Sequence, residues 1–156
     1  MPYRNATICK NGHIISYSQA NVEKYCSKCG AITYSSCPKC GARIRGVYEN
    51  PNVIYIGSFD YELPHYCYQC SKPYPWTQQI LDNAVELLAL DPNLDDESKE
   101  LIKTAIPGLL VDSPSTPVAV AQYKAGIKKA ADFIGNALRQ VLVDVVSEAV
   151  KKVLFP

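Results

Sequence analysis

The chain has 156 residues, of which 47% are hydrophobic and 20% are charged, and its formal net charge is +1. This composition is that of a globular protein and excludes a fully disordered chain. A net charge so close to zero gives no bulk electrostatic reason to expect nucleic acid or an anionic membrane as the partner.

The charge is unevenly distributed along the chain. Up to Pro75 there are eight Lys and Arg against four Asp and Glu, and after it eight against eleven. This change predicts two domains, residues 1–75 and 76–156. No apolar run reaches the ~18 residues of a membrane span, and "MPYRNATICK" lacks the build of a signal peptide. We therefore expect a cytoplasmic protein without a membrane span.

The first half is marked by its cysteines, all seven of which lie between Cys9 and Cys70. Six of them form C-x2-C pairs, which in a reducing compartment are typical of metal thiolates rather than disulfides. Eight ligands suffice for two tetrahedral zinc ions if a histidine replaces the missing cysteine. The candidate ligands are Cys9, His13, Cys26, Cys29, Cys37, Cys40, Cys67 and Cys70.

Three pairings of these ligands are possible. If the two central pairs shared one ion, Cys9 would have to meet Cys70 across more than fifty residues, which loop-closure entropy disfavours without excluding it. A cross-brace, as in RING domains, is the second possibility. We favour the sequential pairing, in which the first four ligands form one site and the last four the other. Each half is then a zinc ribbon, built from a knuckle, a hairpin and a second knuckle.

The second ribbon needs a hairpin between its knuckles. The stretch "RIRGVYENPNVIYIG" has β-rich runs over residues 44–48 and 53–56 on either side of the turn signal "ENPN". We therefore predict that these two runs pair with each other.

The motifs "ICKNGH", "YCSKCGAIT", "CPKCGARIRG" and "LPHYCYQCSKPYPWT" also carry a family resemblance. Together they resemble the N-terminal part of an uncharacterised prokaryotic zinc-ribbon family, a domain of unknown function, over roughly residues 8–77. The knuckles are also similar to those of double zinc ribbons. The resemblance implies the same eight ligands and no reaction. One departure is Ser71, because a glycine commonly follows the last cysteine.

The metal sites are expected to be structural and closed. A catalytic zinc keeps an open position, whereas eight ligands for two ions leave none vacant. No P-loop, H-E-x-x-H or nucleophile-elbow motif occurs, so we expect no enzyme. Zinc is favoured over iron because a histidine does not suit a rubredoxin-type site, although the second, all-cysteine site leaves iron open. His65 is an alternative to His13 as the eighth ligand.

The partner is less well defined than the metal. Ten of the eleven tyrosines precede Trp76 and alternate with lysines and arginines, as in surfaces that stack bases and neutralise phosphates. Thiolates at two zinc sites would reduce the local charge to about +1, which is weak for a nucleic-acid binder. The favoured function is a protein-binding adaptor or regulatory module. A nucleic-acid-binding ribbon and a redox or enzymatic partner subunit are the alternatives.

The second half is predicted to be helical, so the fold class is α+β. Thr77 is the expected N-cap of a first helix that ends before "DPN". A second helix starts at "DDE" and ends before Pro107, and Pro117 opens the last segment. That segment reads as helical to the end, with a possible break at Gly135 and Asn136.

The C-terminal helix carries the prediction about association. Its apolar residues cover more than half of the circumference, and two short helices offer little surface to cover them. An uncovered patch of that size would be an association site. We therefore expect a homodimer or a partner subunit to dock there, with Leu138, Val141 and Val145 at the centre.

Overall fold

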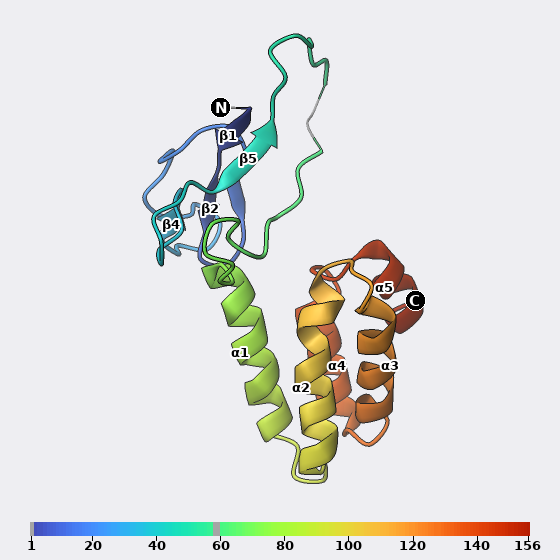
Figure 1. Ribbon diagram of the computed structural model, residues 1–156. Helices are drawn as coiled ribbons and strands as arrows, with labels where there is room; N and C mark the ends of the chain where they lie inside the picture. Colours follow the sequence, from blue (N-terminus) through green and yellow to red (C-terminus); the bar gives the residue numbers. More distant parts are fainter. Residues whose placement is uncertain (1, 58–59) are drawn as a thin grey trace. The chain divides into compact units, whose positions relative to one another are not determined.

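The computed structural model describes residues 2–57 and 60–156, and its contacts divide the chain into two compact units. The ribbon unit is Met1–Gln79, and the helical unit is Ile80–Pro156. The predicted α+β class is confirmed, because small antiparallel sheets come first and five helices follow (Figure 1). The domain boundary predicted after Pro75 stays a prediction.

The ribbon unit contains two small antiparallel sheets. In the first, β2 (Thr7–Cys9) lies between β3 (Ile14–Ser16) and β4 (Thr33–Tyr34). In the second, β1 (Tyr3–Asn5) pairs with β5 (Arg45–Tyr48). Every residue of β2 is buried. The central strand of the first sheet therefore runs through the core of the unit and ends at Cys9.

The core of the ribbon unit is small. Trp76 stacks on Tyr74 with ring centroids 4.8 Å apart, and its indole N–H donates to the carbonyl of Pro64 at 2.8 Å. The buried cluster consists of Ala6, Ile8, Cys37, Ile44, Cys67, Tyr74 and Trp76. Two of its seven members are cysteines, so the packing of this unit depends on groups that also belong to the candidate metal centres.

The predicted hairpin between residues 44–48 and 53–56 is wrong. Residues 45–48 do form β5, but its partner is β1, and residues 53–56 are in no strand. Local hydrogen bonds close a turn here instead, because Val53 N–H donates to the Asn50 carbonyl at 3.1 Å and Asn50 N–H donates to the Tyr55 hydroxyl at 3.2 Å. The N-terminal strand β1 thus pairs with β5 at the edge where the sequence pattern had predicted residues 53–56.

The first two helices start close to the predicted positions, and the second ends later. Helix α1 (Pro75–Ala89) begins two residues before Thr77, which lies buried inside it, so the prediction of Thr77 as its N-cap is wrong. Helix α2 (Asp96–Leu110) is capped by Asp95, whose carboxylate accepts from Ser98 N–H at 2.9 Å. The predicted end before Pro107 is wrong. Burial of Leu109 and Leu110 beyond the proline outweighs the single hydrogen bond that proline removes.

The last segment forms three helices rather than one. These are α3 (Thr116–Ile127), α4 (Asp132–Leu142) and α5 (Glu148–Leu154), and Gly135 with Asn136 lies inside α4. Specific caps set the two breaks. Asp91 accepts from Ala131 N–H at 2.7 Å just before α4, and Ser147 accepts from Val150 N–H at 3.3 Å at the start of α5.

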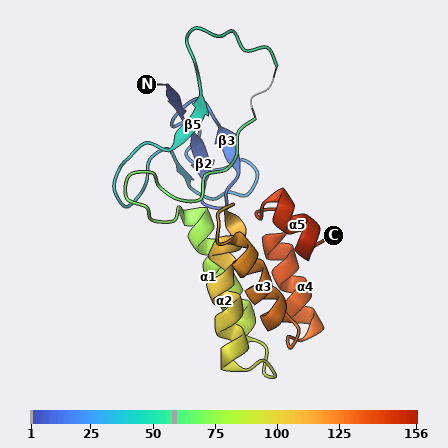
Figure 2. The same ribbon diagram turned by 45° about the vertical axis from the view of Figure 1, so that its right-hand side comes forward.

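Helices α2 to α5 of the helical unit lie together (Figure 2), and their buried side chains form the unit's own hydrophobic core. Helices α2 and α3 approach closely, since a Cβ added at Gly126 would lie 2.6 Å from the Ile102 side chain. The bends fold the apolar face of the last segment inward, and Ile134, Leu138, Leu142 and Val150 are buried. Most of the face expected to be uncovered is therefore covered, and Leu138 cannot be the centre of an exposed contact. Val141 and Val145 are only partly buried, and docking of a copy or a partner on this segment stays a prediction. Among the described residues, no helix combines the length and the apolar character that a membrane span needs.

Candidate metal centres

The ribbon unit contains three C-x2-C knuckles with the same backbone geometry. In each, the first cysteine donates its N–H to the carbonyl five residues on and accepts at its carbonyl from the residue four on, as in Cys26 with Ala31 and Gly30. The closing residue has a positive φ, of 76° at Gly30, 79° at Gly41 and 61° at Ser71. Ser71 thus adopts the conformation that glycine would favour, and the departure noted in the sequence leaves the knuckle intact.

The turn that carries Cys9 and His13 is a tighter version of these knuckles. Cys9 ends β2, its N–H donates to the His13 carbonyl at 3.0 Å, and its carbonyl accepts from Gly12 N–H at 2.9 Å. Gly12 has a φ of 89°, which brings the chain back into β3. The C-x2-G-H pattern therefore places a sulfur and an imidazole on the same side of one turn.

The first site gathers Cys9, His13, Cys26 and Cys29, whose ligand atoms all lie within 4.8 Å of one another. Nδ1 of His13 lies 3.5 Å from Cys9 Sγ and 3.7 Å from Cys26 Sγ. The sulfurs of Cys9 and Cys29 are 3.8 Å apart. The ligands come from the β2–β3 turn and from the knuckle that precedes β4.

The second site gathers Cys37, Cys40, Cys67 and Cys70, also within 4.8 Å of one another. The sulfurs are 3.8 Å apart between Cys37 and Cys70, and 3.6 Å apart between Cys40 and Cys67. One knuckle precedes β5 and the other precedes α1. The structure thus brings together the two sets of the sequential pairing, and neither the nested nor the cross-brace sets.

These distances fit a tetrahedral ion at the centre of each set. With Zn–S of about 2.3 Å and Zn–N of about 2.0–2.1 Å, tetrahedral ligands lie about 3.8 Å apart for two sulfurs and about 3.6 Å for sulfur and nitrogen. A disulfide would need sulfurs about 2 Å apart, and all seven cysteines are free thiols. Each set is therefore able to hold one metal ion, and the two sets can hold two.

At Cys29 of the first site, hydrogen bonds to the sulfur favour the thiolate form that a metal requires. The backbone N–H of Ala31 and the side-chain amide of Asn11 lower the pKa of Cys29 to about 6. Asn11 Nδ2 lies 3.3 Å from Cys29 Sγ, and its Oδ1 accepts from Gln79 Nε2 at 2.9 Å. In the second site the Tyr74 hydroxyl donates to Cys67, and burial raises the pKa of Tyr74.

Burial separates the sulfurs of each site into two kinds. In each of the three C-x2-C knuckles the first cysteine is buried, and these first cysteines are Cys26, Cys37 and Cys67. The second is more accessible, with Cys29 and Cys40 exposed and Cys70 partly buried.

His65 lies in neither set. Its Nδ1 is 2.9 Å from the Thr77 hydroxyl in the first turn of α1, and burial lowers the pKa of His65. Among the described residues, only the sets that contain His13 and the four later cysteines have metal-ligand geometry. The geometry thus favours His13 over His65 as the eighth ligand.

Three neighbouring residues of the sites were not singled out from the sequence. Asn11 stands in the "ICKNGH" motif, and its position before Gly12 in a tight turn is the available signal for a sulfur contact. The sequence places Tyr74 among the tyrosines that alternate with basic residues, and Trp76 at the start of a helix. Their contacts depend on the tertiary fold and leave no mark in the local pattern.

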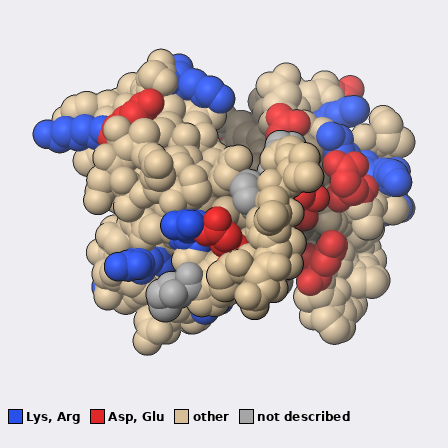
Figure 3. All heavy atoms as spheres, turned by 90° about the horizontal axis from the view of Figure 1, so that it is seen from above, with Lys and Arg blue, Asp and Glu red and all other residues tan. Residues whose placement is uncertain are grey.

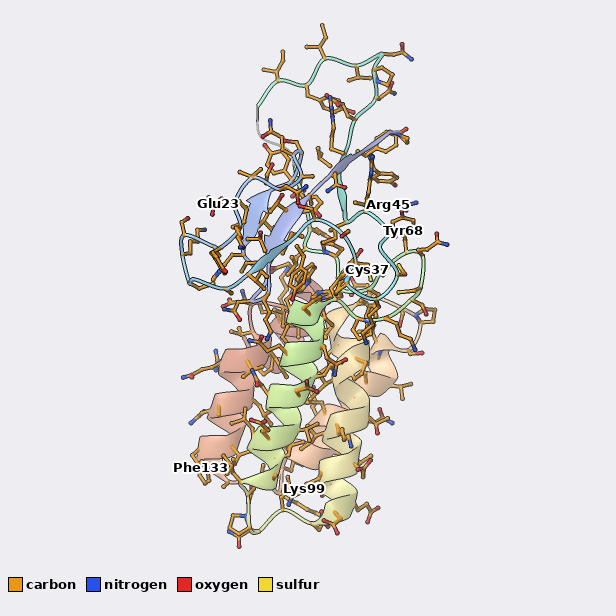
Figure 4. All side chains as sticks on the ribbon, turned by 90° about the vertical axis from the view of Figure 1, so that its left-hand side faces the viewer. Glu23, Cys37, Arg45, Tyr68, Lys99 and Phe133 are labelled. Atoms are coloured by element: carbon orange, nitrogen blue, oxygen red, sulfur yellow. The ribbon has the colours of Figure 1, made fainter. Side chains whose placement is uncertain are left out.

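Basic and aromatic side chains of the ribbon unit lie close together, as the sequence suggested. Arg45 uses its guanidinium for contacts with tyrosine rings of the same unit rather than presenting it to a nucleic acid. The Arg45 guanidinium lies 3.9 Å from the centroid of the Tyr68 ring and 4.5 Å from that of Tyr3 (Figure 4). On the face shown in Figure 3, the basic side chains of the described residues stand in separate groups rather than in one continuous patch. Neither observation favours a nucleic-acid interface.

Two four-ligand clusters on small antiparallel sheets, followed by helices, define a protein with tandem metal-binding ribbons. A family model described as "Uncharacterized protein conserved in bacteria (DUF2321)" matches residues 2–154, so the chain belongs to this family. The predicted family resemblance is confirmed. No curated protein matches the chain. No solved structure matches it either.

Proposed function

We propose that the chain is a zinc-stabilised protein-binding module without catalytic activity of its own. The two closed ligand sets carry the structural part of this proposal. Each offers four protein ligands at tetrahedral spacing, which leaves no vacant position for water or substrate. Sulfur with one imidazole in the first set suits zinc better than iron, and the same ion is expected in the second.

The candidate binding element is the apolar loop, residues 53–56, that follows β5. Ile54 and Ile56 are 90% and 97% exposed, far more than a folded domain without a partner needs. Hydrogen bonds of Asn50 with Val53 and Tyr55 close a turn at the start of the loop. The binding partner would therefore meet a segment in which this turn is already formed, which lowers the entropy cost of association.

The surroundings of the apolar loop favour a protein over a lipid surface or a second copy. The loop itself is uncharged, and Asp60 and Glu62 follow it, which is the wrong sign for an anionic membrane. Four residues also expose too little area for a stable homodimer, which buries about 800 Å² per partner. A groove in a larger protein could enclose both isoleucines.

The structural role of the metal is tested by its removal. We expect two zinc ions per chain by elemental analysis. Chelation should shift the emission of Trp76 to longer wavelength, because this single tryptophan is 2% exposed and shares its cluster with Cys37 and Cys67. One ion per chain, or an unchanged Trp76 emission after both ions are removed, would contradict the proposal.

The binding role is tested by photo-crosslinking in the native cell from a reactive residue at position 54. We expect a discrete protein adduct that survives nuclease treatment and is lost in an Ile56→Asp variant. The matched control places the same group at Phe133, which is 59% exposed in the helical unit, and should not give this adduct. A nucleic-acid adduct, or the same protein adduct from both positions, would contradict a protein-binding loop.

A further inference from the structure

Tyr74, directly before α1, and Trp76, in its first turn, connect the two candidate metal centres within the ribbon unit. Towards the second site, Tyr74 donates to Cys67 and stacks on Trp76. Towards the first site, Trp76 lies against Gly12, where an added Cβ would be 3.4 Å from Trp76 Cβ. Gly12 belongs to the turn that carries Cys9 and His13. A continuous series of contacts thus joins the two sites.

A second connection runs through polar groups. Gln79, one turn further along α1, donates to Asn11 at 2.9 Å, and Asn11 in turn lies 3.3 Å from Cys29 Sγ. Asn11 can orient its amide nitrogen towards the sulfur because its oxygen accepts from Gln79. The position of α1 and the hydrogen bonding of a first-site sulfur are therefore linked.

We propose that the two sites take up metal cooperatively and that the first turn of α1 carries the coupling. This inference rests on the proposed zinc-binding function. Without metal, each knuckle has to be ordered when its ion binds, and that ordering reduces the net affinity. Once one site is formed, the contacts of Trp76 and Asn11 hold the start of α1 and its neighbouring knuckle in place. The second ion then meets a site that is already partly ordered.

The strength of the cooperativity depends on how much of the knuckle ordering is common to the binding of both ions. Coupling between sites is typically 5–150-fold in affinity, and we expect about 10-fold here. By linkage, the factor must be the same in both directions. That reciprocity gives the experiment two independent measurements of one quantity.

The test uses the full chain and cobalt(II) as the probe, because three-sulfur and four-sulfur sites differ in their visible absorption. One variant disables the first site, with Cys26→Ser and Cys29→Ser, and another disables the second, with Cys37→Ser and Cys40→Ser. We expect the remaining site of each variant to bind about 10-fold more weakly than in the intact chain, by a common factor. Unchanged affinities at both remaining sites would overturn the inference.

Variants that keep all eight ligands separate coupling from loss of folding. In native mass spectrometry at one equivalent of zinc, Gln79→Ala and Trp76→Phe should each increase the fraction of chains that hold a single ion. Gln140→Ala, on the exposed surface of α4, is the matched control and should leave this fraction unchanged. If both variants match the wild type, the route through α1 is wrong. A chain that binds no zinc would overturn the proposed function itself.

Discussion

Single backbone angles decide the geometry of the candidate metal centres. Each C-x2-C knuckle closes on a residue in the left-handed region, which costs a residue with a side chain about 1–2 kcal/mol relative to the right-handed one. Two knuckles place glycine there, and the third places Ser71 with a φ of 61°. The second site therefore contains one strained position that its partner knuckle, closed by Gly41, lacks.

Replacement of Ser71 by glycine should stabilise the ribbon unit. Relief of the strain is partly offset by the greater freedom of glycine in the unfolded chain, so we expect a gain of about 0.5–1 kcal/mol. The measurement is the urea midpoint of the zinc-loaded chain, followed by the emission of Trp76.

Gly41→Ser is the matched control for this prediction. A Cβ at Gly41 meets nothing within 4 Å, so the substitution adds backbone strain without a clash. It should lower the midpoint by an amount similar to the gain from Ser71→Gly. Equal midpoints for all three chains would show that the φ value at these positions carries no cost.

At the scale of helices and strands, one buried carboxylate links the turn that follows α1 to the segment between α3 and α4. Asp91, in the turn after α1, is fully buried and accepts from the backbone N–H groups of Ala131 and Asn93. These donors, Ala131 first, lower the pKa of Asp91. The carboxylate thus fixes the break between α3 and α4 that the sequence pattern did not reveal.

The lowered pKa makes the stability of the helical unit depend on pH. The contribution of Asp91 is fully present above the unfolded pKa, about 3.9, and is lost as the pH falls through the lower folded value. We expect Asp91→Asn to destabilise the unit at pH 7 and to flatten this acid dependence. Thermal melts of the full chain at 222 nm, from pH 7 to pH 3, provide the measurement. A variant that melts like the wild type at pH 7 would contradict this role.

The sequence predicted elements well where local spacing determines the structure. The knuckles follow from C-x2-C pairs, and the start of α2 follows from the acidic cap at Asp95. It failed where distant segments compete. Residues 53–56 have the composition of a strand, yet β1 occupies the edge of β5. Likewise, the last segment has an almost unbroken helical pattern, and its first bend is set by the contact of Asp91 with Ala131, which lies 40 residues further along the chain.

At the scale of the whole molecule, the two units have separate sources of stability. The core of the ribbon unit includes cysteine side chains, whereas that of the helical unit is built from aliphatic residues and aromatic side chains such as Tyr123 and Phe155. Loss of a metal site should therefore unfold the ribbon unit, which contains the site, before it affects the helical unit.

Cys37→Ser tests this separation. We expect the variant to lose the second ion and the buried environment of Trp76, because Cys37 is both a candidate ligand and a member of that cluster. The helical circular dichroism should persist, since most helical residues lie in the helical unit. Complete loss of the helical signal would show instead that the chain folds as one cooperative body.

The alternation of buried and accessible cysteines gives each candidate metal centre an inner and an outer side. An alkylating agent or an oxidant that comes from solvent meets Cys29 and Cys40 before it meets Cys26 and Cys37. Attack on a loaded site would therefore begin with the outer sulfur of a knuckle. The inner sulfur stays in the core and keeps the turn in place. Reversible oxidation of this kind leaves a partly coordinated site that can close again once a thiol reductant returns the outer sulfur to the thiolate, whereas alkylation removes that ligand permanently.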